Sequence, residues 1–110
     1  MQTIWKYQLN PKPGIQTVSM PAGATILSVR TMNETCEGPC IWAWVDSERG
    51  KEDRQIEIIF TGQQIQEIPK SRKFIGTVVW GRLVLHVFEL EHPIASLVPS
   101  LMRSMGSAAF

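Results

Sequence analysis

The stretch FIGTVVWGRLVLHVFEL, residues 74–90, decides the fold class of this chain. Apolar side chains alternate on both sides of Gly81, and glycine allows the positive φ that a tight turn requires. Because neighbouring side chains in a strand point to opposite faces, Leu83, Leu85 and Val87 share one face of the second half. The pattern therefore predicts an antiparallel β-hairpin that turns at Trp80-Gly81.

Runs of the same kind occur along most of the chain, and Pro, Gly and Asn residues separate them. Residues 40–46 carry large side chains on both faces, which is typical of a central strand or of one covered by another part of the chain. Seven short strands predict a mainly β fold, either a small sandwich or a barrel-like sheet. The expected strands are 3–9, 15–20, 25–32, 40–46, 54–60, 74–80 and 82–90.

Alternation also predicts which side chains share a face in three of these strands, and this face is expected to be buried in the first and the fifth. Ile59 breaks the pattern within 54–60, and residues 46–54 carry seven charges in nine positions, so we expect a solvated turn there. The expected faces are Trp5, Tyr7 and Leu9 in the first strand, Leu27, Val29 and Thr31 in the third, and Ile56, Ile58 and Phe60 in the fifth.

The segment after residue 91 has a different pattern. Its apolar residues follow the i, i+3, i+4, i+7 spacing of one helical face, so we expect a β domain over 1–91, a helical extension over 92–106 and a frayed end over 107–110. The apolar face either folds back on the sheet of its own chain or forms an oligomer interface with another copy or a partner. That face comprises Ile94, Leu97, Val98, Leu101, Met102 and Met105.

Composition narrows the class of protein. The chain has 110 residues and a net charge of +1, which suits a single domain and gives no electrostatic reason for general nucleic-acid or membrane-surface binding. No apolar run reaches the ~18 residues of a membrane span. The start of the chain shows no secretory signal pattern, and two cysteines are too few for a disulfide scaffold. We expect a cytoplasmic protein.

No arrangement of residues points to catalysis, a metal or a cofactor. Cys36 and Cys40 with His86 and His92 lack a standard zinc-site spacing, so they are read as a loop cysteine, a strand cysteine and ordinary histidines. A disulfide between the two cysteines has no positive support. His86 lies mid-strand among apolar residues with no nucleophile motif nearby, and we interpret it as a half-buried, hydrogen-bonded histidine. We expect that the protein is not an enzyme.

Four tryptophans in so short a chain favour recognition as a function. We expect Trp5 and one of Trp42 or Trp44 to lie in the core and the other of that pair to lie in an interface or under the tail. Trp80, at the hairpin tip, is expected to be more exposed, beside basic residues that suit nucleic acid or a phosphorylated ligand. The candidate binding residues are Trp80, Arg82, Arg72, Lys73 and Trp44.

Several short stretches occur together in this chain: TIWKY at 3–7, MP at 20–21 with GA at 23–24 and ILSV at 26–29, IWA at 41–43 with VD at 45–46, FIGT at 74–77 and HVFE at 86–89. In combination, over about residues 2–90, they resemble a small family of uncharacterised proteins of bacteriophages, prophages and bacteria. The resemblance implies a phage-linked accessory protein and brings no catalytic residues. The segment after Glu91 goes beyond it and is expected to be an addition of this chain.

The resemblance leads to a functional hypothesis by association. A small, nearly neutral, phage-linked protein is expected to occlude or sequester a host factor, either a host protein or a small nucleotide ligand, and inhibition of a CRISPR effector or of nucleotide signalling is one version. The alternative is a structural or assembly module of a virion. A small metal-dependent enzyme is the third hypothesis.

Overall fold

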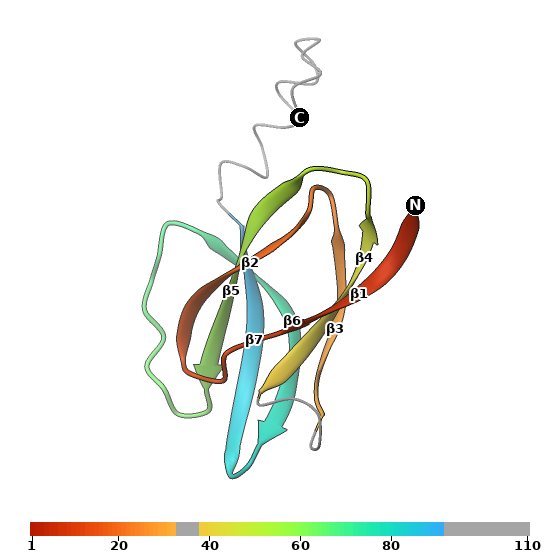
Figure 1. Ribbon diagram of the computed structural model, residues 1–110. Helices are drawn as coiled ribbons and strands as arrows, with labels where there is room; N and C mark the ends of the chain where they lie inside the picture. Colours follow the sequence, from red (N-terminus) through yellow and green to blue (C-terminus); the bar gives the residue numbers. More distant parts are fainter. Residues whose placement is uncertain (33–37, 92–110) are drawn as a thin grey trace.

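A computed structural model describes residues 1–32 and 38–91 of the chain, and in these residues the fold is all-β (Figure 1). It has the seven strands that the sequence predicts, and the expected mainly β class is confirmed. The strands are β1 Gln2–Gln8, β2 Gly14–Pro21, β3 Thr25–Thr31, β4 Pro39–Asp46, β5 Lys51–Phe60, β6 Ser71–Trp80 and β7 Leu83–Glu91.

The strands form two antiparallel sheets that face each other as an open sandwich (Figure 1). The smaller sheet has the order β1-β4-β3, and the larger sheet has the order β2-β5-β7-β6. β4 is the central strand of its sheet, as its large side chains on both faces predict. The edge strands β3 and β6 lie beside each other, so the sheets meet along one side of the sandwich. The hairpin predicted over 74–90 is β6 and β7, with Gly81 at φ 60° in its turn.

The core lies between the two sheets. Strands β4, β5 and β7 each contribute alternate side chains, so each sheet buries one face and leaves the other outward. Burying these side chains stabilises the fold by roughly 25 cal/mol per Å² of apolar surface removed from water. The fully buried apolar side chains on these three strands include Ile41, Ala43, Val45, Ile56, Ile58, Leu85 and Val87.

A β-bulge corrects the face predicted for β3. The register shifts between Ile26 and Ser28, so Leu27 is an extra residue without a partner in the ladder. Ile26 and Val29 pair with core residues of β4 and face inward, whereas Leu27 is exposed. The predicted common face of Leu27, Val29 and Thr31 is therefore wrong, because one inserted residue reverses the alternation.

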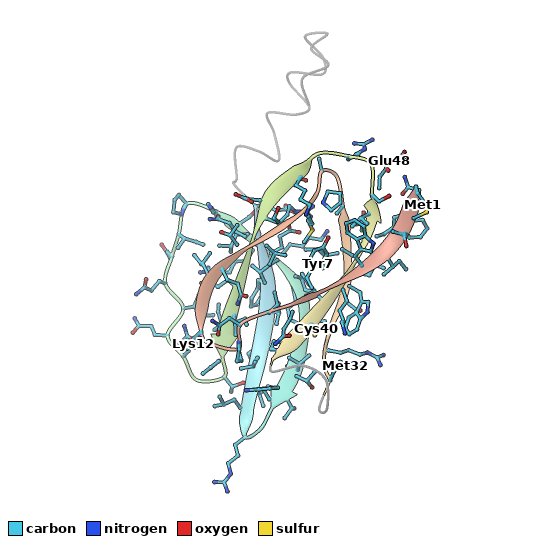
Figure 2. The ribbon with its side chains drawn as sticks, in the orientation of Figure 1. Met1, Tyr7, Lys12, Met32, Cys40 and Glu48 are labelled. Carbon is cyan, nitrogen blue, oxygen red and sulfur yellow. The ribbon has the colours of Figure 1, made fainter. Side chains whose placement is uncertain are left out.

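The face predicted for β1 is only partly buried. Leu9, just after the strand, is buried, and Tyr7 packs against the core, but Trp5 is 37% exposed. β1 is an edge strand, so a large side chain on it is less fully covered than one on the central strand β4. Figure 2 shows Tyr7 in the middle of the molecule. Its hydroxyl is buried without a hydrogen-bond partner among the described residues, and burial raises its pKa.

β5 is longer than predicted because the charged run that precedes 54–60 is partly strand. It begins at Lys51, and the turn is restricted to residues 47–50. Ile56 and Ile58 face the core as predicted. Ile59, which breaks the alternation, is buried on the outer face of the larger sheet, where it lines a hollow together with the segment 63–68.

Gly76 allows β6 to approach β3, and the substitution Gly76→Ala is expected to lower the free energy of unfolding by about 1–3 kcal/mol. A Cβ at this position would lie 2.7 Å from Cγ1 of Val29, which is too close. Urea denaturation measures the loss. Gly50→Ala is the matched control, because no atom lies within 4 Å of its Cβ position. Equal stability of the two variants would contradict the close approach.

Two groups of expectations lie outside the described residues. The first group concerns the end of the chain: the helix predicted over 92–106, the frayed end over 107–110, and the interface residues Ile94, Leu97, Val98, Leu101, Met102 and Met105. The second group concerns Cys36 and His92, which were considered as metal ligands. Within 1–32 and 38–91, no helix is long and apolar enough to cross a membrane.

Candidate functional site

The outward side of the smaller sheet carries both tryptophans of β4. Antiparallel pairing places Ile4 opposite Trp44 and Lys6 opposite Trp42, and residues directly opposite each other share a face. We call this surface the tryptophan face. Its members are Gln2, Ile4, Lys6, Thr25, Leu27, Ser28, Arg30, Trp42, Trp44 and Asp46.

The prediction that one of the two β4 tryptophans enters the core is wrong. Residues two apart in a strand point the same way, so Trp42 and Trp44 both face outward while Ala43 between them is buried. Trp42 is half-buried, and Trp44 is 52% exposed. With the exposed side chains of Ile4 and Leu27, Trp44 forms an apolar patch on the sheet surface.

Trp44 also lines an open cavity of about 330 Å³. Leu27 and Gly23, which lies in the turn between β2 and β3, also line it, and Asp46 with Arg49 adds charged groups. The indole N–H of Trp44 donates a hydrogen bond to Oε1 of Gln2 at 2.7 Å. This bond satisfies the polar edge of the indole and leaves the ring surface for a ligand.

The two ends of the tryptophan face differ in charge. At one end the backbone N–H of Glu48 donates to Asp46, and with the amino group of Met1 it holds the pKa of that carboxyl below its ordinary value. Met1 and Glu48 lie together at this end (Figure 2). At the other end Lys6 and Arg30 are exposed, and neither forms an ion pair with a carboxylate in residues 1–32 or 38–91.

Four of the five predicted binding residues lie on the larger sheet and do not form one patch. Arg72 and Trp80 are near opposite ends of β6, roughly 26 Å apart along the strand. Trp80 is half-buried and packs against the core, rather than extending from the hairpin tip. Lys73 and Arg82 are exposed at the two ends. A binding role for these residues stays a prediction.

Arg72 forms hydrogen bonds within the fold. Its Nε donates to a carboxylate oxygen of Glu57 on β5 at 2.6 Å, and its Nη2 donates to the carbonyl oxygen of Gln66 at 2.8 Å. These bonds connect β6 across β7 to β5, two strands away in the same sheet, and to the segment that follows β5. Because its donors are already used inside the fold, Arg72 is less available to a ligand than Arg82.

A buried ion pair that was not predicted from the sequence lies between the sheets. Arg54 of β5 donates to both carboxylate oxygens of Glu89 on β7, at 2.5 and 3.1 Å, and also to the carbonyl oxygen of Ala24 at 2.8 Å. Burial alone would lower the pKa of Arg54, but the hydrogen bond to Glu89 and the negative charges of Glu89, Glu52 and Glu91 together raise it. Glu89 is in phase with Leu85 and Val87, and this alternation is the signal that could have revealed its burial.

His86 is hydrogen-bonded as predicted. Its Nε2 lies 2.7 Å from the hydroxyl of Thr61, and its Nδ1 lies 3.0 Å from that of Thr77. Both ring nitrogens of His86 are therefore hydrogen-bonded to hydroxyl groups of neighbouring segments. In the part of the chain that the structure describes, no group of three or more His, Cys, Asp or Glu residues could hold a metal ion.

Comparison with known proteins places the chain in a family. Residues 1–97 match the model of a family described as Domain of unknown function (DUF7352). The chain belongs to this family. No curated protein and no solved structure matches it. The family match extends past Glu91 into the segment that was expected to be an addition of this chain, so that expectation is wrong for residues 92–97.

Proposed function

We propose that this DUF7352 member is a non-enzymatic binding protein that recognises a host component through the tryptophan face and acts by occluding or sequestering it. The exposure of Trp44 is the observation that carries the proposal. A tryptophan that is 52% exposed beside exposed Ile4 and Leu27 places apolar surface in water on a β-sheet face. Such a patch is typical of interaction sites, where tryptophan is enriched among the residues that contribute most affinity.

We infer a bacterial host from the resemblance to phage and prophage proteins. The place of action is then the host cytoplasm, and a component of a defence system is the target to test first. The exposure of the site supports occlusion, because the cavity beside Trp44 is partly open to solvent and Trp44 itself is exposed. An exposed face of this kind covers part of a partner's surface, whereas an enzyme usually encloses its substrate.

Affinity capture from lysate of a bacterial host tests the proposal. The full chain is immobilised, and bound components are compared for the wild type, Trp44→Asp and Phe74→Ala. Trp44→Asp is expected to abolish capture of the specific component, because a carboxylate replaces the apolar centre of the patch. Phe74→Ala is the control, since Phe74 is 58% exposed on the other sheet. Capture that survives Trp44→Asp would contradict the proposal.

A further inference from the structure

The tryptophan face combines aromatic rings with cations that have no charge partner among the described residues. Lys6 lies directly opposite Trp42, and Arg30 lies diagonally from Trp42 on the other neighbouring strand. Residues in these positions lie within about 4.5–8 Å at Cβ, close enough for both cations to flank the indole. The only carboxylate on the described part of this face is Asp46, at the far end, and its pairing with the amino group of Met1 compensates its charge.

This arrangement favours a ligand in which flat rings alternate with negatively charged groups. Trp42 and Trp44 are two residues apart on one strand, so their Cα atoms are about 6.7 Å apart. Nucleobases stack on exposed aromatic rings, and the phosphates between them pair with lysine and arginine. A protein partner suits the face less well, since covering it would take both cations out of water, and lysine is depleted from the centre of protein interfaces.

We infer that the tryptophan face binds single-stranded nucleic acid, with a base stacked on Trp44 and the backbone phosphates beside Lys6 and Arg30. The inference rests on the proposed function and names the chemistry of its ligand. A duplex does not fit, because its bases are already stacked on each other and offer no free ring surface. The net charge of +1 for the whole chain is compatible with this site, because stacking supplies part of the affinity and the two cations are concentrated on one face.

Fluorescence anisotropy of the full chain with labelled oligothymidine and oligouridine of about 12 nucleotides tests the inference at low salt. Trp44→Ala is expected to weaken binding roughly 5- to 150-fold, while Trp44→Phe retains most of it. Both variants are expected to fold, because the side chain lies on the surface. Circular dichroism checks their folding.

A charge-matched pair of double variants separates this face from the surface that the sequence predicted. Lys6→Gln/Arg30→Gln is expected to reduce the salt dependence of binding, the slope of log K against log salt, by about 1.4. Lys73→Gln/Arg82→Gln removes the same charge from the larger sheet and is expected to leave affinity and slope unchanged. Loss of binding in this control as large as in the first variant would overturn the inference.

Three other results would also overturn it: no binding by the wild type, equal binding of a duplex of the same length, or competition by a mononucleotide as strong as that by the oligonucleotide. The proposed function fails separately. If the oligonucleotides do not bind while capture from lysate still depends on Trp44, the face recognises a different component and only the inference is wrong. If capture is independent of Trp44, the proposed function is wrong as well.

Discussion

The substitution Glu89→Ala is expected to lower the free energy of unfolding by about 3–5 kcal/mol. Glu89 is 5% exposed and accepts two hydrogen bonds from the guanidinium group of Arg54 between the sheets. Removing the carboxylate leaves a largely buried positive charge whose remaining close contacts among the described residues are the carbonyl oxygen of Ala24 and the carboxylate of Glu52, 3.5 Å away. An unpaired buried charge costs more than the pair itself contributes.

Urea denaturation monitored by tryptophan fluorescence measures this loss. Glu91→Ala is the matched control, because Glu91 is an exposed glutamate two residues along the same strand, and it is expected to change stability by no more than about 0.5 kcal/mol. The double variant Arg54→Met/Glu89→Leu is expected to recover most of the lost stability, since it removes both charges and keeps the volume. A double variant no more stable than Glu89→Ala would contradict this account.

The substitution Ile58→Ala is expected to lower the free energy of unfolding by about 2–5 kcal/mol. Ile58 is fully buried at the centre of the larger sheet, paired with Gly14 on one side and Val87 on the other. Truncation removes buried apolar surface and leaves a cavity, which the strands on both sides can fill only in part. Thermal and urea denaturation both measure the change.

Ile15→Ala is the matched control for this prediction. Ile15 lies on β2, the strand next to β5, but it faces outward and is 50% exposed. The same chemical change there is expected to cost less than about 1 kcal/mol, because little surface is withdrawn from water at that position. Equal losses in the two variants would show that the sandwich does not bury the inner face of β5 more deeply than the outer face of β2.

The bulge in β3 shows why the assignment of faces failed at one strand. Alternation assumes one residue for each step of the ladder, and Leu27 breaks this rule because its neighbours pair with β4 and it does not. The residues of the run 25–32 look the same with or without the bulge. The bulge is decided by the packing of both Ile26 and Val29 into the core, and this packing depends on the opposite sheet.

The predicted binding residues do not lie together for a similar reason. Sequence proximity grouped Trp80 with Arg72 and Arg82, but an extended strand separates residues by about 3.3 Å at each step, so near neighbours in sequence lie far apart in space. The tryptophan face instead joins Lys6, Trp44 and Arg30 from three strands. Of the predicted binding residues, it includes only Trp44.

Local chemistry in the sequence determined the number of strands, their approximate limits and the class of the fold, because alternation and turn residues act over a few neighbouring positions. The tertiary structure decided which strands pair, and that pairing determined which side chains lie together at the site. It made β4 a central strand with two outward tryptophans, placed cations from β1 and β3 beside them, and brought Arg54 to Glu89 across 35 positions of the chain. Long-range pairing depends on how two whole faces fit together, and no short stretch of sequence contains that information.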